Sequence, residues 1–100
     1  MADPPTLSLS TGTFRRDGLL AGIEWCSRLG MEAVEVWINH SQELHRSPQL
    51  QEEARARSRE CGVRLETLHA WGTVADLPDS CPLARDMGIG LIVVHCRREQ

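Results

Sequence analysis

The chain has 100 residues, 41% of them hydrophobic and 25% charged, which is typical of a small globular domain and excludes a disordered or collagen-like chain. Its 11 basic residues are outnumbered by 14 acidic ones, and the net charge of −3 argues against a nucleic-acid-binding protein. No apolar run is long enough to span a membrane, and the N-terminus lacks the pattern of a signal peptide. We therefore expect a cytoplasmic protein with neither nucleic acid nor membrane as a partner.

The first half of the chain alternates strand-like and helix-like patterns. Leucines alternate with serines over residues 6–11, which predicts a strand. Apolar residues then recur every three or four positions over residues 19–29, as on one face of a helix. Residues 33–38 alternate again and predict a second strand. Residues 39–46 are polar and predict an exposed loop that carries His40 and His45.

The second half repeats this alternation. Ser47 and Pro48 suit the N-cap and the first position of a helix that runs to Cys61, with Gly62 ending it. The patterns that follow predict a strand over residues 63–69, a short helix over 79–87 and an apolar strand over 91–95. The expected order is βαβαβαβ, with four parallel strands and three helices.

Three glycines that end helices, Gly30, Gly62 and Gly88, align three similar units. The third, fifth and seventh residues after each glycine should share one strand face, because side chains alternate along a strand. These positions hold Ala33, Glu35, Trp37, Leu65, Thr67, His69, Leu91, Val93 and His95. Each unit therefore places its most distinctive side chain at the carboxyl end of its strand, where parallel α/β proteins bind ligands.

The same pattern fits half of a (β/α)8 TIM barrel, because a complete barrel needs about 250 residues. A flavodoxin-like open sheet is the alternative fold. We assign residues 6–96 to the domain, with tails at 1–5 and 97–100. The four cysteines (Cys26, Cys61, Cys81 and Cys96) contain no C-x-x-C pair, and we expect reduced, mostly buried thiols.

Four segments resemble the N-terminal half of the xylose isomerase-like TIM-barrel superfamily, which includes sugar phosphate isomerases and epimerases as well as apurinic endonucleases. They are LSLST, RLGMEAVEVW, ECGVRLETLHAW and DMGIGLIVVH, and together they run from Leu7 to His95. The resemblance implies the N-terminal portion of a metal-dependent sugar or sugar-phosphate isomerase or epimerase. In that superfamily the metal-binding and acid–base residues belong to later strands, so the resemblance places no catalytic residue in this chain. Whether the chain is itself an enzyme stays open.

The residues expected to bind a sugar-like substrate lie at the carboxyl ends of the strands: Glu35, Trp37, His69, Trp71 and His95. The resemblance implies a divalent metal for the complete barrel. His69 and His95 match zinc-binding positions of the endonuclease branch and are weak metal candidates here. Pocket-lining or core histidines, a structural ion pair for Glu35 and simple packing for the tryptophans are the alternatives.

The second functional hypothesis is a non-catalytic half-barrel that serves as an oligomerisation or interaction module. A half-barrel has two open strand edges, which recruit further strands unless they are covered. Five inward apolar positions, Leu7, Leu9, Leu65, Leu91 and Val93, would also face water. We therefore expect a homo-oligomer, or pairing with a missing C-terminal half, rather than a lone monomer.

Overall fold

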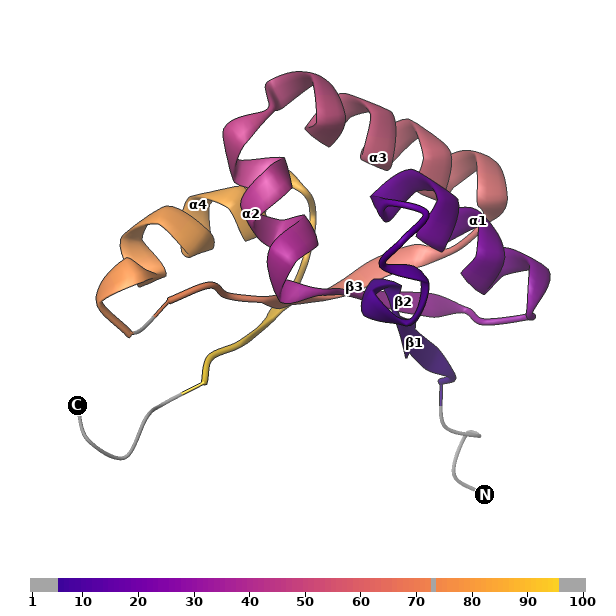
Figure 1. The fold of residues 1–100 in the computed structure, drawn as a ribbon, viewed down its shortest axis with the longest axis horizontal. Helices are drawn as coiled ribbons and strands as arrows, with labels where there is room; N and C mark the ends of the chain where they lie inside the picture. Colours follow the sequence, from indigo (N-terminus) through magenta and orange to yellow (C-terminus); the bar gives the residue numbers. More distant parts are fainter. Residues whose placement is uncertain (1–5, 73, 96–100) are drawn as a thin grey trace.

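A four-stranded parallel sheet forms the base of the molecule (Figure 1). The structure is a computed structural model that describes residues 6–72 and 74–95. The strands are hydrogen-bonded in chain order: β1 (Ser8–Ser10), β2 (Ala33–Val36), β3 (Arg64–His69) and β4 (Leu91–Val93). All neighbouring pairs are parallel. The chain is therefore an α/β protein, as its sequence pattern predicted.

Four α-helices lie on one side of this sheet (Figure 1). They are α1 (Leu19–Arg28), α2 (Ile38–Arg46), α3 (Pro48–Cys61) and α4 (Leu77–Asp86), and 3-10 turns η1 (Thr11–Phe14) and η2 (Val74–Asp76) precede α1 and α4. A flavodoxin-like sheet has its first strand inside the sheet and helices on both faces. Here β1 lies at an edge, an order compatible both with a half-barrel and with an open sheet wound in one direction.

Helix α3 has the boundaries that its sequence predicts. The Ser47 hydroxyl accepts a hydrogen bond from the backbone N–H of Leu50 at 3.1 Å, which caps the first turn. Pro48 occupies the first turn, where no intrahelical donor is needed. Gly62 ends the helix with φ of 70°, in the left-handed region that favours glycine.

Helix α2 was not predicted, so the expectation of three helices and of a loop over residues 39–46 is wrong. The side of α2 that packs against the protein consists of His40, Ser41 and Leu44. Only one of these residues is apolar, so the segment shows no apolar stripe in its sequence. A buried polar network, described below, replaces that stripe.

The core fills the space between the helices and the sheet. Val36, Leu68 and Ile92 lie side by side on three neighbouring strands and form a row on the covered face. Val36 and Leu68 are fully buried there.

The register of β1 and β3, which in β3 includes a shift, corrects two expectations about the other face. Leu65 pairs with Val34 and Thr67 pairs with Glu35, so Glu66 is an extra residue between them. Leu65 therefore packs into the core beneath the helices instead of facing inward. Leu9 also pairs with Val34 and packs against the same core.

No helix among the described residues covers the second face of the sheet (Figure 1). By register, this uncovered face carries Ser8, Ser10, Ala33, Glu35, Thr67, His69, Leu91 and Val93. Leu91 is 56% exposed, as expected for an apolar side chain at an open end of the sheet. Toward the middle the face is polar, and Glu35 and His69 lie near its carboxyl-end edge.

Candidate functional site

Three of the expected site residues come together at the carboxyl-end edge of the sheet. Glu35 on β2 and His69 on β3 lie on the uncovered face, and Nε2 of His69 is 3.5 Å from a carboxylate oxygen of Glu35. The His95 ring, just beyond β4, stacks on the His69 ring with a centroid separation of 5.7 Å. We call Glu35, His69 and His95 the His–Glu cluster.

The His–Glu cluster remains accessible to a small molecule. The side chain of Glu35 is 40% exposed and that of His69 is 23% exposed. A carboxylate accepts hydrogen bonds only, whereas an imidazole both donates and accepts them. The cluster can therefore hydrogen-bond to adjacent hydroxyl groups of a ligand, which also act as both donors and acceptors.

The cluster does not have the geometry of a divalent-metal site. No group of three or more His, Cys, Asp or Glu side chains within residues 6–72 and 74–95 is arranged to hold a metal ion. The rings of His69 and His95 are only 26° from parallel. Nitrogen lone pairs lie in the ring planes, so stacked rings do not direct two of them at one ion about 2 Å away.

The two expected site tryptophans, Trp37 and Trp71, make their contacts with residues outside the His–Glu cluster. Trp37, expected within the second strand, is instead the N-cap of α2. Its ring packs so closely on the loop after β1 that a Cβ at Gly12 would lie 2.7 Å from it. Trp71 packs against the core and lies 4.9 Å, centroid to centroid, from the ring of His45. Both rings thus hold neighbouring elements in place.

A buried hydrogen-bond network joins the 3-10 turn η1, which follows β1, to the N-terminus of α2. The backbone N–H of Trp37 donates to the Thr11 hydroxyl at 2.9 Å, and that hydroxyl lies 2.8 Å from Nδ1 of His40. The His40 ring also meets the Trp37 ring edge-on at 5.2 Å. Thr11 is fully buried and His40 is 2% exposed.

The burial of His40 contradicts the expectation that it lies in an exposed loop, whereas His45 is exposed as expected. The sequence does hold a signal for α2, because Trp37, His40, Ser41 and Leu44 recur at helical spacing. Three of these four side chains carry polar groups, so hydrophobicity alone does not reveal the pattern.

The stability of the protein should depend on pH through His40. Burial lowers the pKa of His40 below its usual 6.5, and the nearby charge of Glu43 opposes this only in part. The unfolded chain then binds the proton more readily than the folded one. The free energy of unfolding therefore rises with pH between the pKa of His40 in the folded protein and its pKa in the unfolded chain. We expect stability to be retained above about pH 6.5 and to fall as the pH drops through the folded-state pKa.

Urea unfolding followed by tryptophan fluorescence over a series of pH values measures this dependence. His40→Gln should flatten it, and the same substitution at exposed His45 should leave it unchanged. Equal pH dependence in the wild type and in His40→Gln would contradict the assignment.

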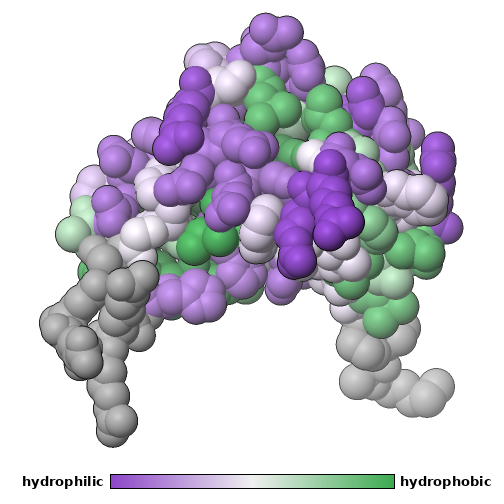
Figure 2. Space-filling view, viewed as in Figure 1, coloured by the Kyte–Doolittle hydropathy of each residue, from purple (hydrophilic) through white to green (hydrophobic). Residues whose placement is uncertain are grey.

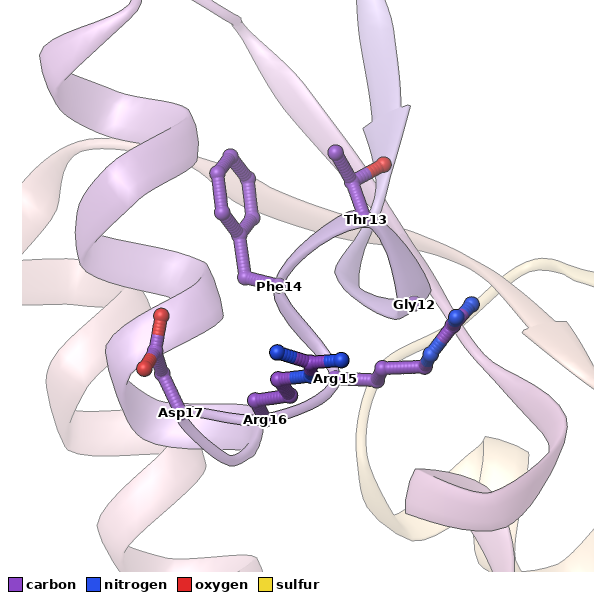
Figure 3. Close-up of a pocket in the computed structure, with 6 residues that line it drawn as sticks. All are labelled: Gly12, Thr13, Phe14, Arg15, Arg16 and Asp17. Carbon is purple, nitrogen blue, oxygen red and sulfur yellow. The ribbon is translucent and has the colours of Figure 1, made fainter.

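An open pocket of about 370 Å³ lies in the loop between β1 and α1 (Figure 3). Six consecutive residues line it: Gly12, Thr13, Phe14, Arg15, Arg16 and Asp17. Figure 3 shows the side chains of Arg15 and Arg16 extending from this loop, with the Asp17 carboxylate on the side of α1. We call it the β1–α1 pocket; none of its residues was among the expected site residues.

The cysteines are only partly as expected. Cys26, Cys61 and Cys81 are free thiols, but only Cys26 is buried, and Cys81 is exposed. Burial raises the pKa of the Cys26 thiol, which keeps it protonated and unreactive. Cys96 lies outside the described residues.

Comparisons with known proteins identified no relative of this chain: no protein-family model, no curated protein and no solved structure matches it. Among residues 6–72 and 74–95, no helix has the length and apolar character needed to cross a membrane.

Proposed function

We propose that this chain is half of a (β/α) barrel and that its His–Glu cluster binds a sugar-like, polyhydroxylated small molecule. The observation that carries the proposal is the position of Glu35, His69 and His95. They lie together at the carboxyl ends of parallel strands, on or beside the face that no described helix covers. Ligands of parallel α/β proteins bind at this end of the strands. Through its resemblance, the chain would be the N-terminal portion of a sugar or sugar-phosphate isomerase or epimerase.

In this proposal the described residues bind and orient the substrate. Glu35 accepts hydrogen bonds from two neighbouring hydroxyls, and His69 donates to or accepts from the next oxygen. The resemblance implies that the proton transfer next to a carbonyl, and the metal that would polarise that carbonyl, depend on later strands of the complete barrel. In this proposal the His–Glu cluster binds the sugar, and no described residue is assigned the proton transfer.

The ends of the sheet support a second candidate function, a half-barrel that associates through its open edges. Three of the five large apolar side chains that are exposed in the described structure belong to the β1–α1 end: Leu7, Trp25 and Leu29. On α1, the Ser27 hydroxyl donates a hydrogen bond to the backbone carbonyl of Cys61 in α3, and Glu24 accepts one from Arg57 of α3. Helical spacing therefore turns Trp25 and Leu29 to the flank of α1 away from α3.

The opposite end of the sheet is also apolar. Leu91 lies on edge strand β4, and Val74 precedes α4; they are the other two exposed apolar side chains. Figure 2 shows hydrophobic residues at the lower margin of the molecule, below a largely hydrophilic helical layer. Pairing β4 of one half-barrel with β1 of another would cover both ends at once.

One experiment tests both parts of the proposal. Millimolar D-xylulose is titrated into the ¹⁵N-labelled chain, and amide shifts along β2, β3 and β4 are measured by NMR; sedimentation equilibrium then gives the mass. We expect shifts at Glu35 and His69, and about tenfold weaker binding in His69→Phe, equivalent to about 1.4 kcal/mol. His45→Phe is the matched control, because His45 touches Trp71 rather than the cluster.

The outcomes separate the two candidates. Sugar binding that His69→Phe weakens supports the sugar-binding proposal. A mass of twice the 11.2 kDa of one chain without any sugar-induced shift supports the interaction module instead. An 11.2 kDa monomer that unfolds cooperatively and binds no sugar overturns both candidates.

A further inference from the structure

The loop that forms the β1–α1 pocket is held rigidly at several points. The backbone N–H of Gly12 donates to the Ser10 hydroxyl at 3.1 Å, and Thr11 belongs to the buried network with Trp37 and His40. Phe14 stacks on Trp25 of α1 with a centroid separation of 5.9 Å. The pocket therefore exists before any ligand binds, which lowers the entropic cost of binding.

The two arginines of this pocket are available to a ligand. Arg15 and Arg16 are exposed, and no ion pair or hydrogen bond involves either guanidinium in the part of the chain that the structure describes. Other arginines do pair there: Arg57 with Glu24 and Arg64 with Glu66. Two cations against the single carboxylate of Asp17 leave the pocket with a net positive charge, in a chain whose net charge is −3.

We propose that the β1–α1 pocket binds an anionic oxygen group, a phosphate or a carboxylate, through Arg15 and Arg16. A guanidinium presents parallel N–H donors that match the oxygens of either group, and it stays charged at any relevant pH. The pocket volume of about 370 Å³ leaves room for such a group together with part of the ligand that carries it.

The position of the pocket connects it with the His–Glu cluster. Ser10 pairs with Glu35 across the sheet, at the usual strand spacing of about 4.8 Å. Gly12 follows Ser10 by two residues, so the two α-carbons of Gly12 and Glu35 lie no more than about 12 Å apart. One ligand can therefore place hydroxyl groups at the cluster and an anionic group in the pocket. This last step rests on the proposed function, whereas anion binding by the pocket does not.

The test titrates the whole chain with inorganic phosphate and, separately, with acetate, against chloride at matched ionic strength. Amide shifts from Gly12 to Gly18 report on the pocket. We expect saturable shifts with at least one of the two anions and about tenfold weaker binding in the double variant Arg15→Gln/Arg16→Gln. Arg28→Gln is the matched control, because Arg28 lies over the Trp25 ring and outside the pocket.

Each outcome decides the proposal. Shifts with phosphate alone identify a phosphate site, shifts with acetate alone a carboxylate site, and shifts with both a general anion site. Shifts no larger than those with chloride, or equal binding by the double variant, overturn it. Glu35→Gln separates this proposal from the sugar site, because it should weaken binding of D-xylulose and leave binding of the anion unchanged.

Discussion

Replacing Leu68 with alanine should destabilise the protein by about 2–5 kcal/mol, the range for removing a fully buried leucine side chain. Leu68 is 0% exposed and lies between Val36 and Ile92 in the middle of the core row. A strand in the centre of a sheet cannot move to fill the cavity without breaking hydrogen bonds on both sides. A small domain has a total stability of about 5–15 kcal/mol, so this one substitution removes a large share of it.

Urea unfolding of Leu68→Ala measures the effect, with Leu7→Ala as the matched control. Leu7 is 56% exposed, so the same truncation there should cost less than about 1 kcal/mol. Equal losses in the two variants would mean that β3 does not lie at the centre of the core.

Thr11→Val should cost about 2–4 kcal/mol, although valine has nearly the shape of threonine. The substitution removes the acceptor of the Trp37 backbone N–H and the partner of His40 Nδ1. Each buried polar group left without a partner costs about 1–3 kcal/mol. Because the network fixes both the start of α2 and the β1–α1 loop, the environment of Trp37 should also change.

Thr13→Val is the control for this substitution. Thr13 lies two residues away in the same 3-10 turn, but its side chain is exposed, so the change should stay within about 0.5 kcal/mol. Unfolding curves and the fluorescence maximum of the folded protein give both readouts. A Thr11→Val protein as stable as Thr13→Val would show that the network does not stabilise the fold.

The regular elements of this fold could be predicted because each has a local cause. The cap at Ser47 and the left-handed glycine at Gly62 determine where α3 begins and ends, whatever surrounds it. Alternation of side chains along β2 and β3 likewise places Glu35 and His69 on the same face of the sheet. The sequence therefore indicated the two members of the His–Glu cluster that face each other.

The features that the sequence did not reveal depend on tertiary contacts. Helix α2 packs through His40 and Ser41, whose burial becomes favourable only once Thr11 and the backbone carbonyls of Val36 and Trp37 provide hydrogen-bond partners. The β1–α1 pocket likewise depends on the packing of Gly12 against Trp37, 25 residues further along the chain. Composition and periodicity carry no information about such distant pairs.

The extra residue Glu66 changes how insertions and deletions act on this strand. Leu65 and His69 are four residues apart, yet one faces the core and the other the uncovered face. Loss of the codon for residue 66 would restore strict alternation and leave Leu65 in the core and His69 on the uncovered face, whereas loss of a further residue between them would turn one of the two to the opposite face. A one-codon deletion at residue 66 is therefore compatible with the present orientation of both side chains, and relatives that lack this codon should be compared by strand face rather than by residue spacing.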